Sequence, residues 1–152
     1  MRIFSVFLVI FITGCGFKTV DPSESNFQLL ETTTSGDKRI GFKIKNKLLT
    51  NSNPNSKEII SIDLNTVKQR SIREKNIKNE VTKYVISVTA NVTINFLNGN
   101  KQVKFNKMRS GVYDTNDQYS QTLNNEKKTL ETLTKKISED IISEIILTLN
   151  AV

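Results

Sequence analysis

The chain has 152 residues, of which 37% are hydrophobic and 24% charged, and this suits one domain with a modest core rather than two. It contains no histidine, no tryptophan and a single cysteine, Cys15. This composition excludes intramolecular disulfides, Cys/His zinc sites, and catalysis by Ser-His-Asp or Cys-His arrangements. The net charge of +7 suits nucleic acid, anionic lipid or an acidic partner, so its location along the chain matters.

The N-terminus has the design of a secretory signal. A short positive start (MR) precedes an apolar run over residues 3–12 that only Ser5 interrupts, and the run is shorter than the roughly 20 residues that a spanning helix needs. It ends in Ile12-Thr13-Gly14-Cys15, which resembles the bacterial lipobox, whose cysteine is lipidated before cleavage. The alternative is a short buried helix with an ordinary cysteine. We predict a signal peptide over 1–14, a lipidated tether over 15–25 that begins at Cys15, and a single domain over 26–152.

The predicted anchor also indicates a compartment. A multiply acylated cysteine anchors a protein stably, whereas one chain gives only marginal binding. Gly16 follows Cys15, at the position where lipoproteins retained in the inner membrane of enteric-type bacteria typically carry Asp. By resemblance to that sorting rule, we expect a lipid anchor on the periplasmic side of the outer membrane, and no nucleic acid partner.

The first part of the predicted domain contains one strand and one helix. Period-2 alternation predicts a strand that begins at Phe27. Ile40, Ile44 and Leu48 then recur at every fourth position with lysines around them, which predicts an amphipathic helix. The predicted elements are a strand over 27–32, a turn with a weak capping signal over 34–37, a helix over about 37–50 and a loop over 50–56.

Three further strands are predicted between residues 58 and 113. The clearest pattern is the unbroken alternation from Tyr84 to Phe96. Asn98-Gly99 then suits the two positive-φ positions of a type I′ hairpin. The predicted elements are a half-buried strand over 58–72, a connection or a strand end projecting past the core over 74–82, a strand over 84–96 and its antiparallel partner over 102–113.

A long amphipathic helix is predicted over residues 123–149. Thr115 to Gln118 has the spacing of a capping box, and apolar residues then keep helical spacing as far as Leu149, with Asp140 on the opposite, polar face. The order β-α-β-β-β-α predicts an α+β domain with two helices packed on one face of a four-stranded, mainly antiparallel sheet. The other sheet face, rich in Ser, Thr and Asn, is left to water or to a partner.

The positive charge is concentrated in the predicted strands. Residues 55–114 carry a net charge of +6, whereas residues 115–152 carry −2. A row of four basic residues, Lys101, Lys104, Lys107 and Arg109, suits an anionic ligand such as a phosphate group. The alternative is that these residues only prevent edge pairing and aggregation. Strict alternation places Lys104 on the face opposite to Lys107 and Arg109.

Little in the sequence indicates an enzyme. The carboxylates are scattered, with no spacing that brings two of them together for acid/base catalysis. Neither a Gly-rich phosphate loop nor a metal-binding spacing is present. We therefore expect no catalytic residues, no bound metal and no cofactor.

Short motifs and the predicted architecture together resemble the LptE family of lipopolysaccharide-assembly lipoproteins. The motifs are Cys15-Gly16-Phe17 after the lipobox, the strand over 84–88, and Gly111-Val112-Tyr113-Asp114 before a long C-terminal helix. Family members commonly continue with a basic or variable residue and then Pro-Leu-Tyr, from which Lys18-Thr19-Val20 departs. This difference bears on the local path of the tether and not on the resemblance to the family.

The resemblance implies a function that the residues alone do not. Members of the family sit as a plug inside the outer-membrane β-barrel LptD, support its assembly, and bind lipopolysaccharide while helping to deliver it to the outer leaflet. On charge alone, we expect Lys104, Lys107 and Arg109 to contact lipopolysaccharide. The alternatives are an accessory lipid-binding lipoprotein of an envelope transporter, without any barrel, and a purely structural envelope lipoprotein.

Overall fold

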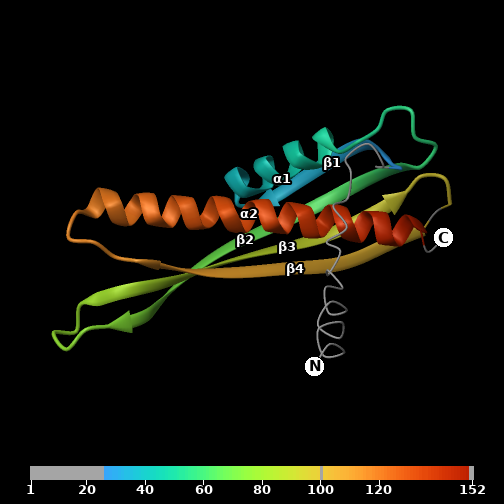
Figure 1. Cartoon of the computed structure of the whole chain (residues 1–152). Coiled ribbons are helices and arrows are strands. Elements are labelled where there is room, and N and C mark those ends of the chain that lie inside the picture. Colours follow the sequence, from blue (N-terminus) through green and yellow to red (C-terminus); the bar gives the residue numbers. More distant parts are fainter. Residues whose placement is uncertain (1–25, 100, 151–152) are drawn as a thin grey trace, which may run out of the picture.

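The computed structural model describes residues 26–99 and 101–150. The predicted signal peptide, the tether and Cys15 lie outside these residues. The structure has the predicted order of elements (Figure 1). These elements are β1 (Gln28–Gly36), α1 (Lys38–Thr50), β2 (Ile59–Lys75), β3 (Val81–Phe96), β4 (Lys101–Asp114) and α2 (Tyr119–Asn150).

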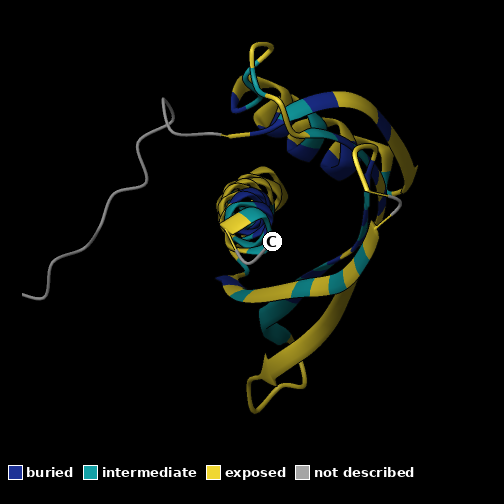
Figure 2. Ribbon diagram, turned by 90° about the vertical axis from the view of Figure 1, so that its right-hand side faces the viewer, coloured by how far each residue is buried: buried dark blue, intermediate teal, exposed yellow. Residues whose placement is uncertain are grey.

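The four strands form one mixed sheet in the order β1-β2-β3-β4. β1 is parallel to β2, because α1 carries the chain back across the sheet between them. The β2–β3 and β3–β4 pairs are antiparallel. Both helices cover the same face, around which the sheet curves (Figure 2). The predicted α+β class and the packing of both helices on one face are therefore confirmed.

The core lies between the helices and the inner face of the sheet. In β3 every second residue from Ile86 to Phe96 is buried, as the alternation predicts. α1 contributes Ile40, Ile44 and Leu48, which are at most 1% exposed. α2 contributes four apolar residues one helical turn apart, Leu133, Ile137, Ile141 and Ile145. Figure 2 shows this buried layer in dark blue.

β2 and β3 continue as a hairpin beyond the core, seen at the lower left of Figure 1. The outer part of β2 is exposed and that of β3 is half-buried, and the pairing runs as far as Lys75 and Val81. Asn79 adopts a left-handed φ of 64° in the turn, which is a conformation that asparagine tolerates. Both interpretations of residues 74–82 hold in part, because strand ends project past the core and residues 76–80 connect them.

The start of α1 differs in part from its prediction. Residues 34–36 do not form a turn, because β1 continues along β2 until Gly36 pairs with Thr66. Gly36 has a φ of 82°, which redirects the chain into the helix. The helix is capped by Asp37, the last residue of the predicted signal, whose Oδ1 accepts hydrogen bonds from the backbone N–H groups of Arg39 and Ile40 at 3.1 Å each, whereas Thr34 lies in β1.

Two predicted local motifs are wrong. Phe96 pairs with Lys101, so four residues connect β3 to β4, and neither Asn98 nor Gly99 has a positive φ. The hairpin is therefore present without a two-residue type I′ turn. The hydroxyl of Thr115 donates to the carbonyl oxygen of Val81 at 2.7 Å, which commits it to β3 instead of a capping box.

Candidate functional site

β4 carries the predicted basic residues on both of its faces. Lys107 and Arg109 lie opposite Ala90 and Val88 of β3 and point toward the helices. Lys104 lies opposite Thr93, on the other face of the sheet, and is exposed. The structure therefore brings Lys107 and Arg109 together and separates Lys104 from them, as the alternation predicts.

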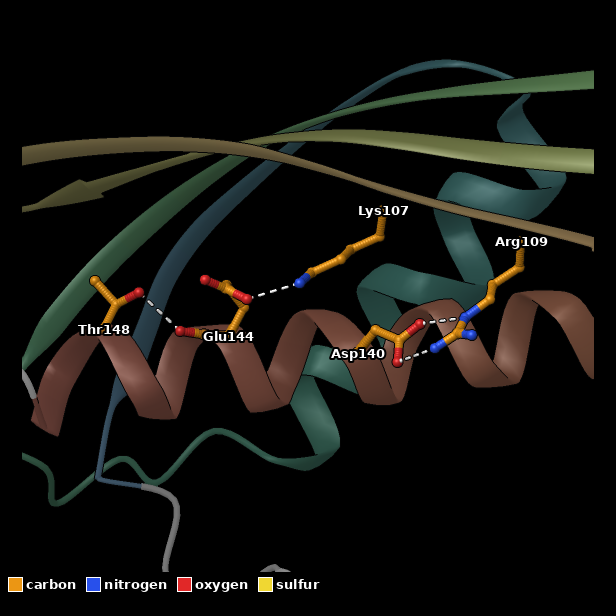
Figure 3. Close-up of polar contacts among 5 residues, drawn as sticks. All are labelled: Lys107, Arg109, Asp140, Glu144 and Thr148. Carbon is orange, nitrogen blue, oxygen red and sulfur yellow. Dashed lines mark hydrogen bonds and ion pairs between the residues drawn. The ribbon is translucent and has the colours of Figure 1, made fainter.

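Lys107 and Arg109 each form an ion pair with α2 (Figure 3). Lys107 Nζ lies 2.6 Å from Glu144 Oε2. The Arg109 guanidinium binds Asp140 through two hydrogen bonds, Nε to Oδ2 at 2.7 Å and Nη2 to Oδ1 at 2.8 Å. This bidentate geometry fixes the orientation of both planar groups.

The two ion pairs follow from matching repeats in the strand and the helix. Residues two apart in a strand are separated by about 6.8 Å, whereas residues four apart in a helix are separated by about 6 Å. Lys107 and Arg109 have the first spacing, and Asp140 and Glu144 have the second. α2 runs antiparallel to β4, so both cations meet an acid at once.

The pairing neutralises the basic face of β4. The hydrogen bond with Asp140, followed by its charge, raises the pKa of Arg109. All four side chains remain at least 26% exposed, so each pair contributes little to stability. An anionic ligand at Lys107 and Arg109 would have to compete with two carboxylates, whereas Lys104 makes no ion pair within the described residues.

A second polar cluster joins the first half of α2 to the sheet. Glu126 Oε2 accepts a hydrogen bond from the Tyr113 hydroxyl at 2.9 Å and lies 3.4 Å from Arg70 Nη1. Lys68 Nζ lies 3.7 Å from the other carboxylate oxygen. The Arg70 guanidinium also lies over the ring of Tyr84, 4.8 Å from its centre. Burial raises the pKa of Tyr113, and the hydrogen bond to Glu126 raises it further.

No sequence motif indicates that Asp140, Glu144 and Glu126 are partners of basic residues on the strands. Helical periodicity places Asp140 on the polar face of the helix, whereas its side chain is only 26% exposed and faces β4. The opposite net charges of the strand region and the helix indicate that the two attract each other. They do not show which residues form pairs, because this depends on how α2 is rotated over the sheet.

A metal site and a membrane-spanning helix are two further features that the described residues do not form. Within residues 26–99 and 101–150, no group of three or more His, Cys, Asp or Glu side chains is placed to hold a metal ion. Over the same part of the chain, none of the helices combines the length and the apolar character that a membrane span requires.

Comparison with solved structures identifies the fold. A protein described as a lipoprotein from Caulobacter crescentus CB15 superposes with a TM-score of 0.60 and 15% identity, over 84% of this chain and 92% of its own. Rare lipoprotein B from Shewanella oneidensis superposes with a TM-score of 0.52 and 16% identity, over 80% and 94%. No family model matches the chain, and no curated protein matches it. The chain therefore has a fold that is found in bacterial lipoproteins.

Proposed function

We propose that this protein is an outer-membrane lipoprotein anchored through Cys15, with its α+β domain on the periplasmic side. The observation that carries the proposal is the agreement between the lipobox and the fold. The single cysteine ends a short apolar run, and the domain that follows has a fold present in two proteins described as lipoproteins. Its role is to bind and to assemble with partners rather than to catalyse a reaction.

Within that class, we propose the function of the LptE family. The domain plugs an LptD-like β-barrel, supports its assembly and helps to deliver lipopolysaccharide to the outer leaflet. The β-α-β-β-β-α order and the Cys15-Gly16-Phe17 motif support this assignment. The polar outer sheet face, which neither helix covers, offers a surface for a barrel wall.

The proposed lipopolysaccharide contacts are Lys104, Lys107 and Arg109. The phosphates of lipopolysaccharide would bind Lys104 directly, and they would bind Lys107 and Arg109 by displacing Glu144 and Asp140. The triple alanine variant should bind lipopolysaccharide more weakly, and the difference should shrink as salt screens the charges. The matched variant Asp140→Asn/Glu144→Gln should bind more tightly, because it frees both cations. Unchanged binding by both folded variants would assign the basic residues to solubility alone.

Co-purification tests the barrel assignment. Tagged, lipidated protein extracted from native outer membranes with mild detergent should bring a large β-barrel with it in stoichiometric amount. Recovery of an inner-membrane transporter instead would favour the alternative function, an accessory lipid-binding lipoprotein. Recovery of neither would leave a structural envelope lipoprotein.

A further inference from the structure

The two helices enclose a groove on the side away from the sheet. One hollow of about 210 Å³ and another of about 180 Å³ adjoin between α1 and α2. They share Lys43, Glu131 and Thr134, so together they form a single groove. We call it the helix groove. It is lined by α1 and α2 alone and includes none of the basic residues of β4.

Basic residues line both sides of the helix groove. α1 contributes Arg39, Lys43 and Lys47, and α2 contributes Lys127 and Lys135. The only acid among the lining residues is Glu131, whose Oε1 lies 3.1 Å from Lys43 Nζ. The hydrogen bond with Lys43, followed by its charge, lowers the pKa of Glu131.

Three of these cations make no ion pair within the described residues: Arg39, Lys47 and Lys127. This distinguishes the groove from the inner face of β4, where Lys107 and Arg109 are each paired with a carboxylate. The groove therefore keeps an excess of positive charge across a hollow surface, which is the arrangement that attracts an anion.

The floor of the groove is largely apolar. Ile40 and Leu130 form part of it. Thr134 and Ser138 also contribute, but their hydroxyl groups donate to carbonyl oxygens of their own helix at 2.7 and 2.9 Å. Cations at the rim and hydrocarbon on the floor suit an amphiphile with an anionic headgroup better than a free phosphate ion, which would gain nothing from the apolar floor.

One end of the groove lies near the start of the described chain. The carbonyl oxygen of Phe27 accepts a hydrogen bond from the N–H of Asn53, just after α1, at 2.9 Å. Lys47 lies in the last turn of the same helix. The eleven residues of the predicted tether, 15–25, reach at most about 40 Å. If Cys15 carries the lipid anchor of the proposed function, the groove lies within reach of the membrane surface.

We propose that the helix groove binds the headgroup of an anionic phospholipid at the bilayer surface. Arg39 and Lys127 hold the phosphate from the two helices, Lys47 attracts it from the adjoining hollow, and the upper part of the acyl chains rests on Leu130. In the anchored protein, before the domain enters a barrel, this contact orients the domain with α1 and α2 toward the membrane. It adds an electrostatic contact to an acyl anchor that already holds the chain at the membrane, so its effect is on the orientation of the domain.

The test uses the mature chain with Cys15→Ser, so that no acyl anchor contributes. Co-sedimentation is measured with vesicles that contain phosphatidylglycerol and with vesicles of phosphatidylcholine alone. The groove variant Arg39→Gln/Lys47→Gln/Lys127→Gln should bind the anionic vesicles about a hundredfold more weakly, since each basic residue at such a surface contributes about a factor of five. The control Lys57→Gln/Lys75→Gln/Lys78→Gln has the same net charge and lies outside the groove, and its binding should fall less than fivefold.

Several results would overturn the proposal. Equal losses in the two variants would mean that net charge alone drives binding, and no wild-type preference for anionic vesicles would remove the site. Short-chain phosphatidylglycerol should compete for the groove, and equal competition by inorganic phosphate would show a simple anion site instead. Because the assay omits both the anchor and the barrel, its failure leaves the proposed function intact, and failed co-purification leaves the groove intact.

Discussion

Removing one hydroxyl from the cluster around Glu126 tests how α2 is held on the sheet. Tyr113→Phe keeps the aromatic ring, which is stacked on Tyr84 at 5.6 Å between centres. It deletes only the hydroxyl that donates to Glu126 at 2.9 Å. Tyr113 is 3% exposed, so water cannot replace this hydrogen bond without opening the structure.

The size of the effect follows from what Glu126 retains. A hydrogen bond to a charged group contributes about 1.5–3 kcal/mol. After the substitution Glu126 still has Arg70 at 3.4 Å and Lys68 at 3.7 Å, so its carboxylate is not left unpaired. We therefore expect the free energy of unfolding to fall by about 1.5 kcal/mol, at the lower end of that range.

The same hydroxyl gives the effect a pH dependence. Burial and the hydrogen bond to Glu126 raise the pKa of Tyr113 above its ordinary value, although Arg70 acts in the opposite direction. The fold therefore favours the neutral phenol. This contribution to the free energy of unfolding is fully present below about pH 10, where the phenol titrates in the unfolded chain. It is lost as the pH rises through the pKa that Tyr113 has in the folded protein. The difference in the free energy of unfolding between the wild type and Tyr113→Phe should therefore become smaller at alkaline pH.

Urea unfolding followed by far-UV circular dichroism measures both effects, at neutral pH and above about pH 10. Tyr119→Phe is the matched control, because Tyr119 is 72% exposed, and its stability should stay within about 0.5 kcal/mol of the wild type. The reasoning is refuted if Tyr113→Phe behaves like this control at neutral pH, or if the difference widens at alkaline pH.

Three further substitutions test the core, the turn into α1 and its cap, each by the same urea assay. Ile137→Ala, at a fully buried position, should cost about 2–5 kcal/mol, whereas Leu147→Ala, 63% exposed, should cost under about 0.5; similar costs would contradict the assigned face of α2. Gly36→Ala should lower the free energy of unfolding by more than about 1 kcal/mol, because φ is 82° and a Cβ would overlap a β2 carbonyl oxygen. Gly99→Ala meets open space and should change it by less than about 0.5 kcal/mol. A Gly36→Ala variant as stable as the wild type would contradict this geometry. Asp37→Ala should cost about 1 kcal/mol by removing the N-cap, and an unchanged transition would show that the cap contributes nothing.

The fold could largely be predicted because local periodicity and core burial agree. The alternation over 84–96 became β3, with every second residue buried. Ile40, Ile44 and Leu48 became the buried stripe of α1. In both elements the side chains that repeat with the correct period are those that the core requires, so local and tertiary preferences coincide.

Two of the wrong predictions occur where tertiary contacts outweigh a local motif. Thr115 had capping spacing, but its hydroxyl bonds to β3 instead. Residues 34–36 had turn chemistry, but pairing with β2 kept them in the strand as far as Gly36. In each case the decisive partner is about 30 residues away in sequence, where a motif of four residues carries no information.

The candidate site could be predicted only in part for the same reason. Alternation correctly separated Lys104 from Lys107 and Arg109. The sequence did not reveal that Glu144 and Asp140 neutralise the latter two, because this depends on how α2 is rotated over β4. The helix groove was also missed, since its two sides lie about 90 residues apart in the chain.

The mass of the purified protein's N-terminal peptide tests the central claim most directly. If the chain is a lipoprotein, protein from its native membrane lacks residues 1–14 and begins at Cys15, with a diacylglyceryl group on the sulfur and an acyl chain on the amine or a free amine. Cys15→Ser should abolish both the modification and the cleavage. An intact Met1, or an unmodified Cys15 thiol in the membrane-bound protein, would contradict the anchor and with it the proposed function.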